Sequence, residues 1–575
     1  METRAKIVFA ISLFILSILL FRLFYLQNID NDPYENRAKN NMISDITIEP
    51  SRGAIYDRNG TLLIDNRNSY NIYLVPERIE NDTNSLITLA SVLEINADSL
   101  FEEISDLSVK NREYRIRRNI DMKTYLRFAE KSKSIRGARI LNEWRRNFPI
   151  ETAPHILGYL SEIKEKDELK PGLKIGDLVG KEGIEFVYDS LLRGSKGLKQ
   201  ELRDVKSRKV SDYNPENWIK PKKGDDIYLT IDSRLQEFTE NLMKDLSGSI
   251  VVMNCNNGEI LAMASKPDYP LTVFSDKISP ETWNELVNNP DRPLYSKAVQ
   301  GEYAPGSILK MLNYLSAAEL KVVNKSTIFY CPGGMTIGNS FKKCWLHSGH
   351  GDVNITGAIQ MSCDTYFYEV AKNIDIDKWH NVLKRFGLGN KTGIDLRYER
   401  PGNVPDKKFY KSKFRGSMLG RYANLMIGQG EILITPLQAA VFTSALANDG
   451  YLLKPRLLKC NVSETDSIES TVEKSKIEVN LEDIKTVKNG MFHVVNTAGG
   501  TAYRSRSDKI TYAGKTGTVE NAHGGDHAWF TSFGPYDNPE ISVVIFEEHG
   551  KHGSSVAPLA KKIYEYWYEL YKQKK

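Results

Sequence analysis

The sequence is poor in cysteine and has almost no excess of either charge. Five cysteines in 575 residues is an odd and low number, which excludes a small disulfide-stapled scaffold. Lys and Arg total 78 against 73 Asp and Glu, and this net charge of +5 gives no reason to expect a nucleic-acid partner. With 41% hydrophobic and 26% charged residues, the chain is typical of a globular protein rather than a disordered, collagen-like or polytopic membrane protein. Its length corresponds to about four average domains.

Long apolar segments are also absent, except for one near the N-terminus. Residues 7–26 carry a single charge, Arg22, and about 20 apolar residues are enough for a helix to cross a bilayer. A cleaved signal peptide and a buried helix are the alternatives, but bulky residues follow Arg22 where a cleavage site would need small ones. Basic residues precede the segment, whereas Asp30 and Asp32 follow it. The positive-inside rule therefore predicts a single-pass signal anchor within residues 1–28, with a cytoplasmic N-terminus.

Two regions of different character follow this anchor. Residues 29–225 are rich in charge and in short strand-like runs such as Tyr70–Val75, and they contain few groups that look catalytic. A boundary is indicated at Pro221–Gly224, because this turn-forming segment precedes the strand-like run Ile227–Ile231. Beyond it, apolar strands alternate with helical stretches. We therefore predict an N-terminal domain over 29–225 and a large α/β or α+β domain over 226–575.

A serine and a lysine three residues apart form the first candidate catalytic pair. Ser307 and Lys310 follow Pro305 and Gly306 and open an apolar helical pattern. Positions i and i+3 share one face of a helix, so we expect the hydroxyl and the amine to lie close together. A buried lysine near another cation can take the proton of a serine and so activate it as a nucleophile. The pair alone is weak evidence, because such spacing arises by chance on a solvated helix face.

Two further segments complete the candidate site. Ser362 and Asp364 follow a long polar stretch, and Lys515–Thr518 lies in a strand-like context. A lysine and two hydroxyls at a strand edge suit a substrate carboxylate, and the glycine between them lets a substrate backbone come close. A second K-T-G sequence, Lys391–Gly393, follows a Gly-rich turn, and we interpret it as part of that turn.

The three segments resemble the S-x-x-K, S-x-N/D and K-T-G motifs of penicillin-binding proteins and serine β-lactamases, and they occur in the same order. Flanking segments extend the resemblance over nearly the whole chain. Arg52–Gly60 resembles the sequence that follows the anchor in class B penicillin-binding proteins, and Gly428–Gly430 and Gly500–Ala502 look like further family segments. The motif that begins at Ser362 has Asp364 where Asn is commoner, and in this it resembles the elongation-specific group, penicillin-binding protein 2. Nothing in 29–225 resembles a glycosyltransferase, which disfavours the bifunctional class A enzymes.

The resemblance implies both a fold and an activity. The fold would be α/β (α+β), with a transpeptidase domain at 226–575 that combines an antiparallel sheet flanked by helices with an all-α subdomain. A pedestal or dimerisation-like domain would occupy 29–225, and one transmembrane helix 1–28. The activity would be that of a D,D-transpeptidase, which crosslinks peptidoglycan stem peptides during cell elongation through a serine acyl-enzyme and is inhibited by β-lactams. A septal class B transpeptidase, a D,D-carboxypeptidase or β-lactamase, and a non-catalytic cell-wall scaffold remain as alternatives.

The resemblance also implies a role for each candidate residue. Ser307 would be the nucleophile and Lys310 its base, while Ser362 would relay protons and Asp364 would orient this network. Lys515 would act electrostatically on Lys310 and attract the substrate carboxylate. Thr516, Gly517 and Thr518 would bind the substrate. The backbone N–H groups of Ser307 and Thr518 would form the oxyanion hole.

Three of the five cysteines lie near one another in the sequence, together with two histidines. Three thiolates and an imidazole form a reasonable tetrahedral zinc set, and the candidate ligands are Cys331, Cys344, His350 and Cys363. The intervals between them are longer than in C-x2-C motifs, so buried free cysteines and a disulfide stay open as alternatives, and His347 could replace His350. The resemblance favours a structural zinc, because some members of the group carry a metal at corresponding positions. Catalysis itself would require no cofactor.

The resemblance implies partners and a location as well. The substrates would be the stem peptides of nascent glycan strands made from a lipid-linked precursor, and β-lactams would be inhibitors. A polymerising glycosyltransferase of the elongation complex (RodA-like) and a rod-shape scaffold protein would bind the pedestal. The catalytic domain would lie in the periplasm or otherwise outside the bacterial cytoplasmic (inner) membrane.

Overall fold

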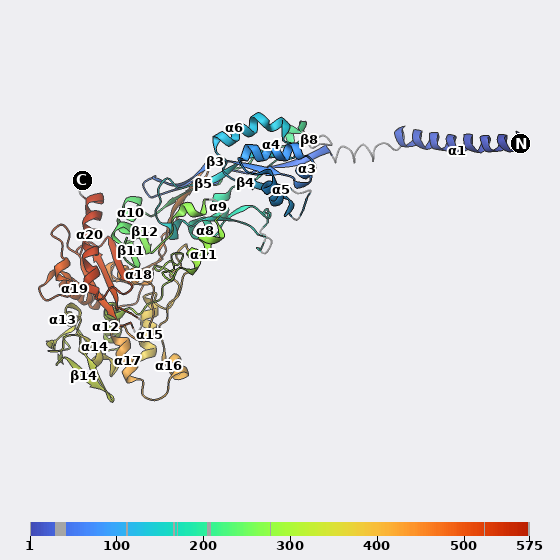
Figure 1. The fold of residues 1–575 in the computed structure, drawn as a ribbon. Helices are drawn as coiled ribbons and strands as arrows, with labels where there is room; N and C mark the ends of the chain where they lie inside the picture. Colours follow the sequence, from blue (N-terminus) through green and yellow to red (C-terminus); the bar gives the residue numbers. More distant parts are fainter. Residues whose placement is uncertain are drawn as a thin grey trace. The chain divides into compact units, whose positions relative to one another are not determined.

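The computed structural model describes residues 2–28, 42–107, 109–110, 113–164, 167–168, 171–203, 209–275, 278–521 and 524–572. The chain falls into two compact units. One consists of Met1–Arg52 and Arg193–Gly224, and the other of Gly53–Leu192 and Asp225–Lys575. Figure 1 labels the elements of both.

The first unit contains the N-terminal apolar helix α1, Glu2–Asn28. Its segment Thr3–Tyr25 has a mean hydropathy of 2.7 and is the one helix of the described residues long and apolar enough to cross a membrane. The predicted apolar helix is therefore present and is consistent with a single-pass anchor. The unit also contains an antiparallel sheet in the order β1-β8-β9. Its further elements are β1 (Ile43–Ile48), β8 (Gly197–Arg203), β9 (Lys209–Tyr213) and η2 (Pro215–Asn217).

A mixed seven-stranded sheet contains strands from both segments of the second unit. Its order is β19-β18-β10-β2-β3-β4, with β5 paired to β3. Ile55 of β2 pairs in parallel with Ile227 of β10, so strands from before and after residue 225 share this sheet. The strands are β2 (Ile55–Tyr56), β3 (Leu62–Leu74), β4 (Tyr114–Arg117), β5 (Ala138–Asn147), β10 (Asp226–Leu229), β18 (Leu458–Val462) and β19 (Ser467–Glu469).

A small separate core lies beside strands β3 and β5. Ile72 and Leu74 of β3 pack there with helix residues such as Leu89 and Ile104. Side chains at the N-caps start three of these helices, as Asp82 does by accepting a hydrogen bond from the N–H of Ser85. The helices are α3 (Pro76–Glu80), α4 (Thr83–Leu93), α5 (Ala97–Ser105), α6 (Met122–Lys131) and η1 (Ser132–Ser134). The chain continues through α7 (Pro154–Leu157), β6 (Leu160–Glu162), β7 (Leu178–Gly180), α8 (Gly183–Val187) and α9 (Asp189–Arg193).

A five-stranded antiparallel sheet in the order β12-β11-β23-β22-β21 forms the centre of the second unit. Nearly every residue of its strands is buried, as expected for a sheet covered on both faces. The strand at one edge is β21, which carries the K-T-G segment. The strands are β11 (Gly248–Asn254), β12 (Ile260–Lys266), β21 (Ala513–Val519), β22 (His527–Gly534) and β23 (Ile541–Glu547).

Helices cover the two faces of this sheet. Thr531 of β22 hydrogen-bonds Thr443 of α18, whereas its neighbour Ser532 accepts a hydrogen bond from Tyr564 of α20. Successive strand residues point to opposite faces, so α18 and α20 lie on opposite sides. A capping box starts α18 with Thr435 and Gln438. The bounds are α10 (Ser233–Leu242), α18 (Pro436–Ala447), α19 (Leu481–Asn496) and α20 (Gly553–Tyr571).

A mainly helical subdomain is inserted between β12 and α18 and carries the first two motifs. Its central helix α12 is buried at every position from Lys310 to Ala317. The helices are η3 (Leu271–Phe274), α11 (Pro280–Asn288), η4 (Gly306–Leu309), α12 (Lys310–Glu319), α13 (Ile355–Gln360), α14 (Asp364–Ala371), α15 (Ile376–Arg385), α16 (Lys407–Lys413) and α17 (Leu419–Met426). Short strand pairs accompany them: β13 (Phe329–Cys331) with β16 (Gly351–Val353), and β14 (Gly334–Ile337) with β15 (Ser340–Lys343). Further along the chain are β17 (Tyr451–Leu453), β20 (Lys474–Lys476) and η5 (Tyr503–Ser505).

The predicted α+β architecture is confirmed, with an antiparallel sheet flanked by helices and a mainly helical subdomain. The subdomain is not purely helical, because the two strand pairs β13–β16 and β14–β15 lie within it. Sequence periodicity missed them since each strand has only three or four residues.

Candidate active site

Ser307 lies in the tight turn η4, immediately before helix α12. The turn depends on two glycines: Gly306 has a φ of +56°, and its N–H donates to the carbonyl of Gly428 at 2.8 Å. A Cβ on Gly428 would lie 2.0 Å from the carbonyl oxygen of Gly306, so only glycine permits this approach. Ser307 is partly exposed, and its hydroxyl has no hydrogen-bond partner among the described residues. The hydroxyl is therefore available to a ligand.

The Lys310 amine, which is fully buried, is bound by the second motif. It donates to Oδ1 of Asp364 at 2.7 Å, to the carbonyl of Ser362 at 2.9 Å and to Oγ of Ser362 at 3.3 Å. Among the described residues, no hydrogen bond joins it to Ser307. We expected the two groups to lie close together on one helix face, but Ser307 lies in η4 and Lys310 begins α12, and the amine is directed at Ser362 and Asp364 because a buried ammonium needs a carboxylate and acceptors.

Ser362 links this group to the K-T-G strand. The amine of Lys515 donates to Oγ of Ser362 at 2.9 Å and to the carbonyl of Thr516 at 2.8 Å. The Ser362 hydroxyl thus lies between two buried lysine amines. Ser362 itself has a φ of +55°, a left-handed conformation that is strained for a residue other than glycine. The three motifs therefore meet at one side chain, and the strained backbone is what presents it.

Electrostatics favour a neutral amine in this group. Burial lowers the pKa of Lys515 well below its usual value, and the positive charge of Lys310 lowers it further against the opposing effect of Asp364. Two ammonium groups cannot both be stabilised by one carboxylate in a buried site. The arrangement can therefore hold one protonated and one neutral amine beside a hydroxyl.

The remaining K-T-G residues lie along the edge strand β21. Thr516 shares a hydrogen bond with Thr501 at 2.7 Å between the two hydroxyls, and Thr518 accepts one from the N–H of Gly553 at 3.2 Å. Gly517 packs against the nucleophile turn, because a Cβ on it would lie 3.1 Å from Cγ2 of Ile308. The glycine thus lets β21 lie close to the turn that carries Ser307. This is a second reason for glycine at this position, beside the approach of a substrate backbone that we predicted.

Three residues near the motifs were given no role by the sequence. Thr501 contacts Thr516, and Gln429 donates to the carbonyl of Thr518 at 3.3 Å. Both lie in the flanking segments that already resembled the family, which was the available signal. The third, Trp345, donates its backbone N–H to Oδ2 of Asp364 at 3.1 Å. No local pattern marks Trp345, because its role comes from a turn that folds back onto α14.

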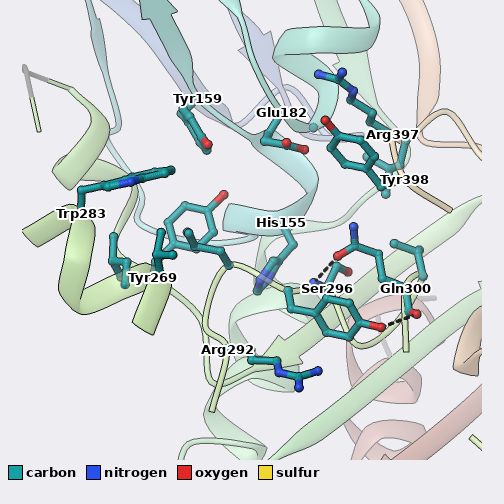
Figure 2. A pocket seen from close by; sticks show the side chains of 17 residues that line it. His155, Tyr159, Glu182, Tyr269, Trp283, Arg292, Ser296, Gln300, Arg397 and Tyr398 are labelled. Carbon is teal, nitrogen blue, oxygen red and sulfur yellow. Dashed lines mark hydrogen bonds between the residues drawn. The ribbon is translucent and has the colours of Figure 1, made fainter. Parts of the chain in front are cut away.

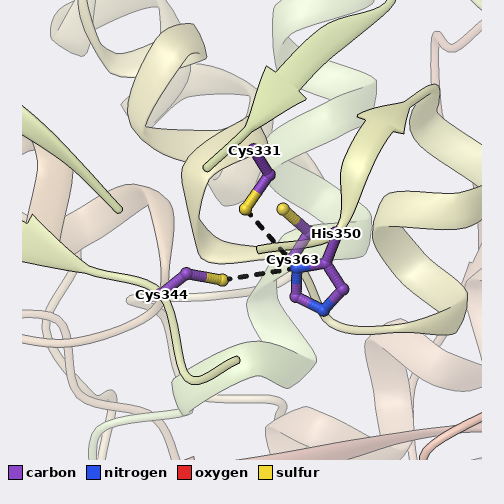
Figure 3. Close-up of side chains that lie close together, drawn as sticks. All are labelled: Cys331, Cys344, His350 and Cys363. Atoms are coloured by element: carbon purple, nitrogen blue, oxygen red, sulfur yellow. Dashed lines mark hydrogen bonds between the residues drawn. The ribbon is translucent and has the colours of Figure 1, made fainter. Parts of the chain in front are cut away.

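The predicted metal ligands converge beside the second motif (Figure 3). Their four ligand atoms lie within 4.8 Å of one another, and the residues are Cys331, Cys344, His350 and Cys363. Nδ1 of His350 lies 3.5 Å from the sulfur of Cys331 and 3.6 Å from that of Cys344. All three cysteines are free and buried, so the predicted alternative of a disulfide does not occur here. His347 is not part of the group.

This cluster contacts residues of the second motif directly. Cys363 lies between Ser362 and Asp364 and is the N-cap of α14, and the N–H of Asp364 donates to the sulfur of Cys344 at 3.4 Å. The hydrogen bond between the two thiols lowers the pKa of Cys344 and raises that of Cys363. The cluster could hold a metal ion, and an ion there would stabilise the backbone that presents Ser362.

Comparison with known families identifies the chain. The penicillin binding protein transpeptidase domain matches residues 248–565, and the Penicillin-binding Protein dimerisation domain matches residues 47–229. The chain belongs to the penicillin-binding protein transpeptidase family. The motifs of this penicillin-binding protein lie within the first match, and the second match covers residues 47–225 of the N-terminal region that looked non-catalytic.

Individual relatives of this penicillin-binding protein agree with that assignment. It is 32% identical to the peptidoglycan D,D-transpeptidase MrdA of Haemophilus influenzae, over 98% of this chain and 91% of the relative. It is 33% identical to MrdA of Acinetobacter baumannii, over 98% and 87%. Among solved structures, the penicillin-binding protein PBP2 of Helicobacter pylori in complex with MreC has a TM-score of 0.83 at 30% identity, over 92% of this chain and 100% of that one.

These matches confirm the predicted class and activity. The penicillin-binding protein is a serine-type peptidoglycan D,D-transpeptidase, similar to the peptidoglycan D,D-transpeptidase MrdA and to the penicillin-binding protein PBP2. The stage V sporulation protein D of Bacillus subtilis is a more distant relative, at 27% identity.

Proposed function

We propose that this penicillin-binding protein crosslinks peptidoglycan through an acyl-enzyme on Ser307, with Lys310, Ser362 and Lys515 handling the protons. The observation that carries this proposal is the Ser362 hydroxyl between the buried amines of Lys310 and Lys515. Ser307 lies in the turn just before the helix that begins with Lys310, and its hydroxyl, which has no hydrogen-bond partner among the described residues, can be reached by a substrate carbonyl.

Acylation begins when Oγ of Ser307 attacks the carbonyl carbon of the penultimate D-Ala of a donor stem. Before the attack, a proton passes from Lys310 through the Ser362 hydroxyl to the neutral amine of Lys515, so that Lys310 becomes neutral and Lys515 positively charged. The proton of Ser307 then passes to the neutral amine of Lys310, and the tetrahedral oxyanion is held by backbone N–H groups of Ser307 and Thr518. The peptide C–N bond then breaks, and the departing terminal D-Ala takes a proton relayed through Ser362. An amine of a neighbouring stem attacks the ester, loses a proton to the same network, and releases Ser307.

The edge strand β21 supplies the binding part of the proposal. An extended peptide can add to a free sheet edge, where backbone hydrogen bonds hold it in register. Lys515 attracts the terminal carboxylate of the donor, and the hydroxyls of Thr516 and Thr518 bind it directly. Asp364 balances the charge of Lys310 and keeps it directed at Ser362, as its 2.7 Å contact supports.

We propose zinc as the metal of the cysteine cluster. Three sulfurs and an imidazole nitrogen are the donor set of closed, structural zinc sites, and their mutual proximity within 4.8 Å fits one ion. Bound there, zinc would keep the thiols deprotonated and fix the chain at Cys363. It would take no part in the proton transfers and would act only by holding Ser362 and Asp364 in place.

The other regions have proposed roles too. Residues 1–28 anchor the enzyme by a single pass of the cytoplasmic membrane, residues 29–225 form the pedestal, and residues 226–575 carry the transpeptidase. The apolar exposed surface of α1 supports the first of these. The solved complex of a relative with MreC supports a rod-shape scaffold protein as one partner of the pedestal. We also propose a RodA-like glycosyltransferase as partner, since a crosslinking enzyme needs newly polymerised strands.

Labelling with a fluorescent penicillin tests the site assignment. The full-length protein should be labelled on the peptide that contains Ser307, and Ser307→Ala should remove the label. Ser316→Ala is the matched control, because Ser316 is buried on α12 and its hydroxyl has no partner among the described residues. It should label like the unmodified protein. Labelling at another serine would refute the assignment, and rapid turnover of the ester would indicate a β-lactamase instead.

A shape assay in the source bacterium tests the cellular role. Replacing the gene by one for Ser307→Ala should turn rods into spheres, because elongation stops while division continues. Filamentous cells would instead indicate a septal transpeptidase, and unchanged growth would indicate a scaffold.

A further inference from the structure

The second unit contains a cavity of about 390 Å³ that none of the catalytic residues lines (Figure 2). Its walls come from three separate parts of the chain: the α7–α8 region, the segment from Tyr269 to Gln300, and the loop of Leu396–Tyr398. A volume of this size suits a small organic ligand or one to two sugar rings. The cavity is therefore large enough to be a binding site in its own right.

Aromatic rings form much of its wall. In the view of Figure 2, Tyr159, Tyr269 and Trp283 gather on one side and Tyr398 on the other. Tyr159 is held by stacking on Phe274, with ring centroids 3.8 Å apart, and so presents a fixed surface. Trp283 is 40% exposed on α11, a helix that buries none of its residues, so the packing of the fold does not explain the position of its indole. Flat apolar surfaces of this kind suit the C–H faces of a pyranose ring.

Charged groups without ion-pair partners complete the wall. No ion pair is found within the described part of the chain for Glu182, Arg292 or Arg397, and all three line the cavity. Burial raises the pKa of Glu182, although Arg397 and Lys181 act against it. Arg397 stacks on Phe186 at 4.1 Å, which holds its guanidinium in place. Because the wall carries two guanidinium groups and only one carboxylate, it favours a ligand that itself carries a carboxylate.

Buried hydrogen-bonding groups are also left free in the cavity. The hydroxyl of Ser296 is buried, with the residue only 7% exposed, and has no partner among the described residues. Such a group costs free energy unless something satisfies it. Nε2 of His155 donates to the carbonyl of Pro293 at 2.8 Å, and burial lowers the pKa of His155 to about 4, so its Nδ1, which has no hydrogen-bond partner in the described part of the chain, can accept one from a ligand. The cavity thus offers both donors and acceptors to a polar ligand.

We infer that this cavity binds a muramyl peptide, that is, an N-acetylated pyranose of a glycan strand together with the first residues of its attached stem. The aromatic walls fit the sugar, and the guanidinium groups fit the stem carboxylate. A stem peptide alone has too little apolar surface for five aromatic and several aliphatic side chains, and an unsubstituted sugar lacks the carboxylate. The inference rests on the proposed peptidoglycan substrate.

Part of the cavity wall lies shortly before Ser307 in the sequence. Tyr295, Ser296 and Gln300 belong to its wall, and Ser307 follows only a short loop later. Within this wall Gln300 accepts a hydrogen bond from the N–H of Ser296 at 2.9 Å and one at its carbonyl from Tyr295. A strand held here would be retained by the enzyme between successive crosslinks, separately from the donor peptide in the active site.

Calorimetric titration of the full-length protein with muramyl dipeptide tests this inference. We expect saturable binding, and at least about tenfold weaker binding of N,N′-diacetylchitobiose, which has N-acetylated sugars but lacks the carboxylate, and of L-Ala-D-isoGln, which lacks the sugar. Trp283→Ala and Arg292→Asn should each weaken muramyl dipeptide binding about tenfold. Asn suits position 292 because Arg292 has a φ of +53°. Trp144→Ala is the control, since Trp144 is also 40% exposed but lies outside the cavity.

Prior acylation of Ser307 with penicillin separates the two sites. Unchanged affinity for muramyl dipeptide after acylation would support a distinct site, whereas loss of binding would place the ligand in the active site and overturn the inference. Absence of saturable binding in a protein that penicillin still labels would overturn the inference alone. An equal effect of Trp144→Ala would also overturn it. Failure of penicillin to label Ser307 would instead overturn the proposed function.

Discussion

The strained serine of the second motif allows stability and activity to be separated. Ser362 has a φ of +55°, and its hydroxyl accepts hydrogen bonds from Lys515 at 2.9 Å and from Lys310 at 3.3 Å. Ser362→Ala and Ser362→Gly both remove the hydroxyl. They differ in the backbone, because alanine keeps the left-handed strain of about 1–2 kcal/mol and glycine relieves it. Glycine in turn lowers the free energy of unfolding by about 0.5–1 kcal/mol, because it gives the unfolded chain greater conformational freedom.

The free energy of unfolding should therefore be higher for the glycine variant, by roughly 0–1.5 kcal/mol after the two effects are subtracted. Both variants should be less stable than the unmodified protein, since the lost hydrogen bond to the protonated amine contributes about 1.5–3 kcal/mol and the one to the neutral amine about 0.5–1.5 kcal/mol. The rate of acylation by penicillin should fall by about 10²–10⁴ in both variants alike, because both lack the proton relay.

Urea unfolding and stopped-flow acylation of the two variants provide the assay. If acylation survives in Ser362→Gly, the hydroxyl is not the relay and the proposed mechanism is wrong. If the alanine variant is the more stable of the two, position 362 is not strained in solution. Acylation rates that follow stability would show that the loss of activity is structural rather than chemical.

Three further predictions concern the lysine, the metal cluster and the strand glycine. Burial and the positive charge of Lys310 lower the pKa of Lys515 in the folded protein, so the unfolded chain binds more protons at this lysine. The free energy of unfolding that depends on Lys515 therefore rises with pH, from the lowered pKa up to the usual pKa of a lysine. Lys515→Met should abolish acylation and raise the free energy of unfolding more at pH 7 than at pH 10; an equal gain at both pH values would contradict the lowered pKa. Purified protein should contain stoichiometric zinc by mass spectrometry, and Cys344→Ser should lose it while Cys460→Ser, outside the cluster, keeps it; protein without zinc would refute the site. Gly517→Ala should destabilise the fold by about 1–3 kcal/mol and slow acylation, because its Cβ would meet Trp529 and Ile308 at 3.0 and 3.1 Å, whereas Gly420→Ala has open space and should do neither.

Much of the catalytic group could be predicted from the sequence because each motif is local. Ser307 and Lys310 lie three residues apart in the consecutive elements η4 and α12, and the K-T-G segment occupies one strand, so residue type and spacing within a few positions identify them. The same holds for the apolar helix α1. The short strand pairs of the helical subdomain were missed, since strands of three or four residues have too little periodicity to detect.

The sequence by itself determined the order of the motifs, the apolar helix α1 and the set of possible metal ligands. The tertiary structure decided which groups touch: the amine of Lys310 lies on Ser362 and Asp364 rather than on Ser307, and His350 rather than His347 joins the three cysteines. It also assembled the cavity that holds Glu182 and Trp283. These contacts join residues far apart in the chain, and their meeting depends on how the sheet and helices pack and on the need of each buried charge for a partner.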